Sequence, residues 1–182
     1  MKLKEWDQRY QSGETAFDTP VPLVVEIAEI VAAGMPGRAL DVACGAGRNA
    51  IYLARQGWQV KAVDGSAAAL ATLHQRNGDL PIETALVDLE REALNIPAGC
   101  YDLIVAAYYL QRDLFPAMMR GVRQGGVLIA IVHVAGQPTP RRAAPGELKS
   151  IFEGWEILHY YEGEPREDCH RQPVAEIAAR KP

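Results

Sequence analysis

The sequence predicts an α/β fold with a mostly parallel, doubly wound sheet that is covered by helices on both faces. Two observations support this. Short β-branched apolar runs alternate with helical stretches through about residue 134, and strands that alternate with helices in this way form parallel sheets. Beyond residue 134, two strand-like runs joined by a charged turn predict a closing antiparallel pair.

Each element follows from a local pattern. Apolar residues recur at helical spacing after Pro20 and Pro22, and glycine and proline between residues 34 and 37 end that first helix. Ser66 precedes another helical stretch and can cap it. Further helices are predicted over residues 49–56, 67–76 and 112–122. Strands are predicted over residues 38–42, 58–63, 82–87, 101–107 and 127–134.

The last third of the chain has a different composition. Residues 135–146 contain three prolines and the pair Arg141-Arg142, and this pattern indicates a long loop. A short helix is predicted near residues 147–152, and strands are predicted over 155–161 and 173–179. No repeat or linker divides the chain, so residues 1–182 are expected to form one domain.

The bulk composition is that of a soluble protein. Hydrophobic residues make up 48% and charged residues 23% of the 182 residues, which suffices for a single core. The net charge of −4 argues against nucleic acid or an anionic membrane as the main partner. Three separated cysteines and the lack of a membrane-length apolar run lead us to expect a cytoplasmic protein.

The most informative segment is LDVACGAGRN, which begins at Leu40. An apolar strand ends near Asp41, and Gly45 and Gly47 follow before the next helix. Glycines at these positions allow a tight turn and a close approach of the backbone to a ligand. Asp41 beside the turn would repel a pyrophosphate, and it is placed to hold a cationic, amino-acid-like group or to orient the loop.

Three aspartates, Asp41, Asp64 and Asp88, are predicted at the ends of successive strands. Ligands of open parallel sheets bind outside the carboxyl ends of the strands. Asp64 is placed to accept hydrogen bonds from ribose hydroxyls, and Asp88 with Leu89 to meet the adenine amine. For any one aspartate, the alternative is a helix cap or a turn former.

A nicotinamide cofactor is the main alternative, because Gly45 to Ala50 also satisfies the pattern G-x-G-x-x-A. That motif places a helix N-terminus against a pyrophosphate, which the Asp41 carboxylate would oppose. A dehydrogenase also needs residues for a substrate domain, and this chain has few to offer. A nucleoside cofactor with a cationic end is therefore favoured.

These motifs resemble those of the class I S-adenosylmethionine-dependent methyltransferases, from LDVACGAGRN through Asp64 in KAVDGS, Asp88-Leu89 in LVDLE and YDLIVAA to Gly125-Gly126. CGAGRNAIYLARQGWQVKAVDGS and the tail from GELKSIFEGWEILHYYEGE to His170-Arg171 are similar to the small tellurite-resistance (TehB-like) methyltransferases. WDQRYQSGETAFD is similar to the N-terminal segment of the thiopurine and tellurite methyltransferases. That segment often has a second tryptophan at the position where this chain has Phe17.

The resemblance implies a Rossmann-like, seven-stranded fold that binds S-adenosylmethionine and releases S-adenosylhomocysteine. It implies an N-terminal lid over residues 1–19, a cofactor-binding core over 38–134, and an acceptor-side loop with closing strands over 135–182. The candidate cofactor residues are Tyr10, Asp41, Gly45, Gly47, Asn49, Asp64, Gly65, Asp88, Leu89 and Ala106.

The candidate catalytic residues are Tyr108, His133, His170 and Arg171. Tyr108 follows the fourth strand and could bind an acceptor oxyanion or pack in the pocket wall. His133 ends the fifth strand, on the active-site side of the sheet. The resemblance places His170 and Arg171 at the acceptor site, whereas the residues alone are equally consistent with a solvated turn. No metal site is predicted.

The expected activity is methyl transfer to a small acceptor, either a tellurite-type chalcogen oxyanion or a small thiol or amine. Such a transfer is an in-line displacement that depends on positioning in a dry pocket. The alternatives are a small NAD(P)-dependent oxidoreductase and a non-catalytic module that binds S-adenosylmethionine. The protein is expected to be a monomer or a homodimer, with no nucleic-acid or membrane partner.

Overall fold

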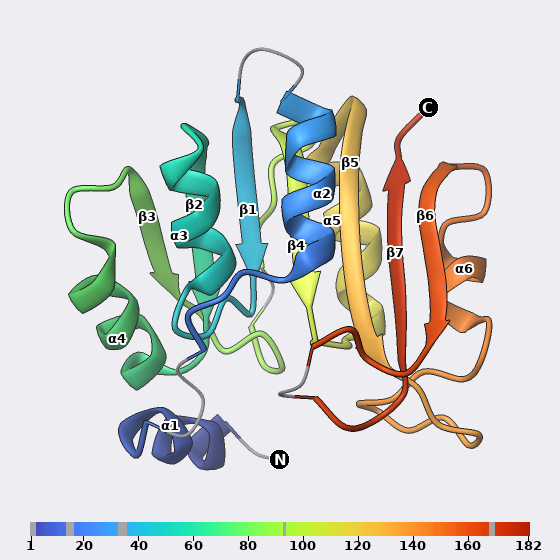
Figure 1. Cartoon of the computed structure of the whole chain (residues 1–182). Coiled ribbons are helices and arrows are strands. Elements are labelled where there is room, and N and C mark those ends of the chain that lie inside the picture. Colours follow the sequence, from blue (N-terminus) through green and yellow to red (C-terminus); the bar gives the residue numbers. More distant parts are fainter. Residues whose placement is uncertain (1–2, 14–16, 33–35, 93, 168–169) are drawn as a thin grey trace.

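A computed structural model describes residues 3–13, 17–32, 36–92, 94–167 and 170–182. Its centre is a seven-stranded sheet with the order β3-β2-β1-β4-β5-β7-β6 (Figure 1). The first five strands along the chain are parallel, and β7 runs antiparallel to both β5 and β6. The predicted mixed sheet with a closing antiparallel pair is therefore confirmed. The strands are β1 (Arg38–Val42), β2 (Gln59–Asp64), β3 (Ile82–Leu86), β4 (Tyr101–Ala107), β5 (Val122–His133), β6 (Glu156–Gly163) and β7 (Val174–Arg180).

Helices cover both faces of the sheet. One face packs against α2, α3 and α4, which lie in front of the sheet in Figure 1, and the other packs against α5 and α6 behind it. These two apolar layers enclose the central strands β1, β4 and most of β5, which are buried on both sides, whereas the edge strand β3 is partly exposed. The helices are α2 (Pro22–Ala32), α3 (Arg48–Arg55), α4 (Ala67–Asn77), α5 (Phe115–Gly121) and α6 (Glu147–Ile151), with a 3-10 turn at Arg112–Leu114 before α5.

One further helix, α1 (Leu3–Gln11), was not among the helices predicted from the sequence. Leu3, Trp6 and Tyr10 recur on it at helical spacing, but none of its residues is fully buried. It lies beyond the carboxyl ends of the parallel strands and packs against α4 (Figure 1). Its position depends on a few specific contacts rather than on a buried face.

The fifth strand begins earlier than predicted. The sequence predicts a turn at Gln124-Gly125-Gly126, but β5 already begins at Val122, which pairs with Tyr101 before the register shifts. A Cβ on Gly126 would lie 2.9 Å from the carbonyl oxygen of Asp102, closer than real Cβ contacts. The glycines therefore belong to an irregular part of the strand, where the neighbouring backbone approaches closely.

Within the ranges given above, no helix has the length and apolar character that a membrane span needs. Cys44 and Cys100 are free thiols, and Cys169 lies outside the described residues. The carboxyl ends of β1 to β5 meet along one edge of the sheet. The segments that follow these strands therefore converge with α1 and with the β6–β7 connection (Figure 1).

Candidate active site

A cavity of about 670 Å³ lies at this edge of the sheet. Its walls come from α1, from the segments after β1, β2, β3, β4 and β5, and from the connection between β6 and β7. The volume falls in the range of small-molecule and cofactor sites. Of the predicted site residues, Asp41, Gly47 and Ala106 do not line the cavity, whereas Tyr10, Gly45, Asn49, Asp64, Gly65, Asp88, Leu89, Tyr108, His133, His170 and Arg171 do.

The glycine turn after β1 requires glycine at both positions. Gly45 has a φ of 56° and Gly47 a φ of 81°, values that strain other residues. A Cβ on Gly45 would lie 2.3 Å from the hydroxyl oxygen of Tyr10, and a Cβ on Gly47 would lie 2.2 Å from Leu73 Cδ1. Gly45 therefore allows α1 to approach the turn, and Gly47 allows Leu73 of α4 to pack against it.

Asp64 ends β2 and braces the loops on both sides of the cavity. Its Oδ2 accepts a hydrogen bond from the Gly45 backbone N–H at 2.8 Å, and its Oδ1 accepts one from the Ser66 N–H at 2.8 Å. Burial raises the pKa of Asp64, and the backbone N–H groups oppose that shift. A carboxylate has about four lone-pair sites, so Asp64 can still accept hydrogen bonds from a ligand.

Asp88 and Leu89 follow β3 and line the cavity beside Asp64. The Asp88 Oδ1 accepts a hydrogen bond from the Glu90 backbone N–H at 3.2 Å, so this residue also forms the turn after the strand. Leu89 is buried and supplies an apolar surface. The structure thus brings two strand-end carboxylates and one apolar wall together at the β2–β3 end of the cavity.

Asp41 was predicted to hold a cationic group or to orient the loop, and its place in the structure fits the second role. Asp41 is 1% exposed and does not line the cavity. It precedes the last residue of β1 and points toward α3, where its Oδ2 accepts a hydrogen bond from the Ala50 N–H at 3.1 Å. Burial raises its pKa to about 7. Asp41 therefore fixes the start of α3 beneath the glycine turn.

Ala106 is also placed differently from the prediction. It is buried in the core on the α5 side of the sheet, and its neighbour Ala107 lines the cavity instead. Successive residues of a strand point to opposite faces, so a shift by one position separates a core residue from a site residue. Asn49 does line the cavity, and its Oδ1 accepts a hydrogen bond from the Val21 N–H at 3.0 Å.

Helix α1 covers the cavity through Leu3, Trp6, Arg9 and Tyr10. Tyr10 lies against the glycine turn, and burial raises the pKa of its phenol well above the usual range. The phenol is therefore neutral at physiological pH. It forms a mostly apolar part of the cavity wall, with the hydroxyl oxygen as its one polar atom.

The opposite end of the cavity contains three stacked or tilted rings. The His170 ring lies parallel to that of Tyr108, with centroids 3.5 Å apart, and His133 lies 5.6 Å from Tyr108. Burial lowers the pKa of His133, and it lowers that of His170 to about 4. Both imidazoles are therefore neutral near pH 7. The predicted candidates Tyr108, His133 and His170 do come together here.

Two residues of this end, Arg48 and Glu167, were not predicted. Glu167 Oε1 accepts a hydrogen bond from Arg48 Nη1 at 2.5 Å, and Glu167 Oε2 accepts one from the Tyr108 hydroxyl at 2.5 Å. Next to it, Arg166 forms ion pairs with Glu26 of α2 and with the buried Glu176 of β7, each at 2.9 Å. These bonds hold Arg166 and Glu167 against α2, α3, β7 and Tyr108.

Exposed arginines form the rim of the cavity. Arg171 lines it from the β6–β7 connection, and Arg141 and Arg142 line it from the loop after β5. Arg141 pairs with Glu90 at 2.6 Å. Across the part of the chain that the structure describes, no group of three or more His, Cys, Asp or Glu side chains could hold a metal ion.

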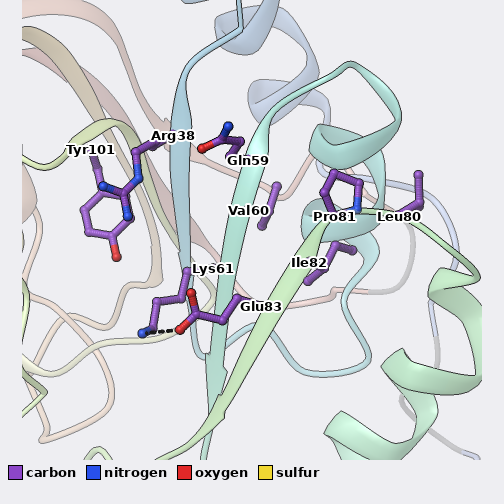
Figure 2. Close-up of a pocket in the computed structure, with 9 residues that line it drawn as sticks. All are labelled: Arg38, Gln59, Val60, Lys61, Leu80, Pro81, Ile82, Glu83 and Tyr101. Atoms are coloured by element: carbon purple, nitrogen blue, oxygen red, sulfur yellow. Dashed lines mark hydrogen bonds and ion pairs between the residues drawn. The ribbon is translucent and has the colours of Figure 1, made fainter.

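A smaller hollow of about 380 Å³ lies at the amino ends of the parallel strands, remote from these residues (Figure 2). The ammonium group of Lys61 and the carboxylate of Glu83 are 2.7 Å apart across it, and the Arg38 guanidinium lies over the Tyr101 ring. Ligands of open α/β sheets bind at the carboxyl ends instead, so the larger cavity is the candidate active site.

Comparison with known proteins points to one family. The family model described as "Tellurite resistance protein TehB" matches residues 10–172. A probable S-adenosyl-L-methionine-dependent methyltransferase TehB of Haemophilus influenzae is 32% identical over 154 residues, which are 76% of this chain and 52% of that protein. The chain thus spans about half the length of this curated relative.

Solved structures agree with this family. The crystal structure of TehB from Haemophilus influenzae superposes with a TM-score of 0.75 at 26% identity, covering 97% of this chain and 67% of that one. A Haemonchus contortus phosphoethanolamine N-methyltransferase 2 in complex with S-adenosyl-L-methionine has a TM-score of 0.75 at 15% identity, covering 100% and 60% of the two chains. The second match shows a shared fold alone.

Proposed function

The chain belongs to the TehB family of tellurite resistance proteins, and from this premise we propose that it transfers a methyl group from S-adenosylmethionine to a small acceptor. The observation on which this proposal rests is the arrangement of side chains along the cavity. A glycine turn and two strand-end aspartates line one end, and a tyrosine and two neutral histidines line the other. This arrangement suits a nucleoside cofactor at one end and its acceptor at the other.

The residues at the aspartate end fit S-adenosylmethionine. Asp64 would hold the ribose hydroxyls with its remaining lone pairs, and Asp88 with Leu89 would meet the adenine. Gly45 lines the cavity without a side chain, and the Tyr10 hydroxyl occupies the place that its Cβ would take, so the methionine part would lie along this turn beside Tyr10. Asp41 contributes only by fixing α3. When bound, S-adenosylmethionine supplies an electrophilic methyl group on a sulfonium sulfur.

The residues of the chain position and shield the reactants. Trp6 and Tyr10 of α1 cover the cavity and limit access of water. His133 and His170 are neutral near pH 7, so they place no positive charge beside a sulfonium cation. Because the thioether is a good leaving group, holding nucleophile and methyl carbon in line in a dry pocket can supply much of the catalysis.

The acceptor that we propose is a tellurite-type chalcogen oxyanion or a small thiol or amine. The exposed Arg142 and Arg171 support an anion, because guanidinium groups at a cavity rim attract oxyanions. The family description supports the chalcogen class. A thiol or amine is supported by the small and partly aromatic acceptor end.

The test combines binding with turnover. Calorimetry should show that S-adenosylmethionine and S-adenosylhomocysteine both bind, and no heat from either at millimolar ligand would contradict the proposal. A panel of oxyanions, thiols and amines is then scored by release of S-adenosylhomocysteine. Binding without release from any acceptor would indicate a non-catalytic module. A change in NADH fluorescence would favour the oxidoreductase.

A further inference from the structure

Tyr108 is held in a fixed orientation at the acceptor end. Its backbone has a φ of 59°, which is uncommon for any residue other than glycine. The ring of His170 stacks on the Tyr108 ring with an interplanar angle of 9°. Because both the main chain and the ring are constrained, the position of the Tyr108 hydroxyl is set by the fold.

The hydrogen of this hydroxyl is directed at Glu167. The chain of hydrogen bonds runs from Tyr108 to Glu167, which also accepts from Arg48. A carboxylate only accepts hydrogen bonds and a guanidinium only donates them, so both hydrogen bonds are directed at Glu167. The Glu167 and Arg48 side chains are 10% and 12% exposed, and water therefore competes little for these bonds.

On the basis of the methyl transfer proposed above, we propose that Glu167 is a positioning residue that selects the class of acceptor through Tyr108. With its hydrogen bonded to Glu167, the phenol oxygen has only lone pairs to offer to the cavity. The acceptor therefore carries a hydrogen on the group that meets Tyr108, as a small amine, a thiol or a hydrogen-bearing oxyanion does. An oxyanion without hydrogen would place its own lone pairs against those of the Tyr108 oxygen, and the two groups would repel each other.

The charges around Tyr108 agree with this selection. The positive charge of Arg48 is balanced by the carboxylate of Glu167. His133 and His170 are neutral near pH 7, because burial lowers their pKa values. Arg142 and Arg171 are exposed at the rim. These arginines can attract an anion to the cavity, but the Tyr108 oxygen accepts a hydrogen bond only from a group that carries a hydrogen.

The variant Glu167→Gln reverses the polarity of this contact. Arg48 can only donate, so the amide oxygen of the new side chain turns to Arg48 and the amide N–H group turns to Tyr108. The Tyr108 hydroxyl then directs its hydrogen into the cavity. A site built to hydrogen-bond a donor discriminates strongly against an analogue that lacks it, and the variant should lose or invert this discrimination.

The experiment measures kcat/KM for two acceptors, a small amine or thiol and selenite at a pH where it carries no hydrogen. The wild type should favour the hydrogen-bearing acceptor, and Glu167→Gln should lower that ratio by about tenfold or more. Tyr108→Phe should lower it as well. The matched control is Glu162→Gln, which changes a carboxylate that accepts from the Tyr160 hydroxyl outside the cavity. This control should leave the ratio unchanged.

A second measurement needs no acceptor. Burial and the hydrogen bond to Glu167 raise the pKa of Tyr108, so Glu167→Gln should lower the pH at which one tyrosine ionises, as followed by phenolate absorbance. That transition should be missing from the double variant with Tyr108→Phe. An equal loss of both acceptor activities at a constant ratio would overturn the proposal. Failure of the methyl transfer itself would instead appear as no S-adenosylhomocysteine release with any acceptor.

Discussion

Asp41 and Asp64 belong to neighbouring parallel strands, yet they have different roles because Asp41 pairs with Ala62, two residues before Asp64, and therefore lies deeper in the sheet. Asp41 points toward α3 and bonds Ala50, whereas Asp64 lines the cavity. The sequence shows an acid near the end of each strand but does not show how the two strands are aligned. That register decides how far each acid lies from the carboxyl end of the sheet, and strand ends are the least certain part of a sequence-based assignment.

The buried Asp41 should make stability depend on pH. Its pKa is raised from 3.8 to about 7 by burial, so the folded state binds more protons than the unfolded state between these values. Stability therefore falls as pH rises through this window and levels off above it. Each unit of pKa difference corresponds to about 1.4 kcal/mol, so the total loss is a few kcal/mol.

The variant Asp41→Asn keeps an oxygen for the Ala50 N–H and removes the charge. Its stability relative to the wild type should increase from about pH 5 to about pH 8, by about 2 kcal/mol or more. Urea unfolding at both pH values measures this difference. Parallel stability curves for the two proteins would show that Asp41 ionises normally in the folded state.

Asp64 should dominate cofactor affinity at the residue scale. Asp64→Ala removes the carboxylate that we propose for the ribose hydroxyls, and it releases the Gly45 and Ser66 N–H groups that hold the loops. The loss of charged hydrogen bonds should weaken S-adenosylmethionine binding by about 2–4 kcal/mol, as measured by calorimetry. The control is Glu83→Ala in the adjacent strand, outside the cavity. Unchanged affinity for Asp64→Ala would show that the ribose is held elsewhere.

At the element scale, α1 is docked by one carboxylate. Asp7 Oδ1 accepts hydrogen bonds from Ser66 Oγ at 2.7 Å and from the Ala68 N–H at 3.0 Å, at the start of α4. These two bonds lower the pKa of Asp7, so the contact stays charged at neutral pH. Ser66 also donates its N–H to Asp64. The helix over the cavity is thus connected to the proposed ribose ligand.

Asp7→Ala should therefore free α1 without unfolding the core. We expect faster hydrogen exchange over residues 3–11 and a loss of S-adenosylmethionine affinity of about 1–2 kcal/mol, the value of two hydrogen bonds. The global unfolding transition should change little, because α1 has no fully buried residue. Gln8→Ala is the matched control, since Gln8 is exposed on the same helix. Equal exchange in both variants would contradict docking through Asp7.

At the scale of the whole molecule, the alternation of strands and helices sufficed to predict the sheet and most elements. Strand 38–42 and strand 101–107 match the structure without change. What was missed depends on contacts between distant residues. Glu167 meets Tyr108 across 59 positions, and no local spacing indicates that pair. Helix α1 is held by contacts with α4 rather than by its own pattern.

Because the cavity is formed by segments from both ends of the chain, ligand binding should stabilise the entire domain. S-adenosylhomocysteine at about 100 times its Kd adds about 2.7 kcal/mol of stability. For a domain of this size, each kcal/mol raises Tm by about 2–4 °C, so a shift of about 5–10 °C is expected in a thermal melt. NADH at the same concentration should give no shift if the cavity takes S-adenosylmethionine, as we propose. A larger shift with NADH than with S-adenosylhomocysteine would contradict the cofactor that we propose, while leaving the fold unaffected.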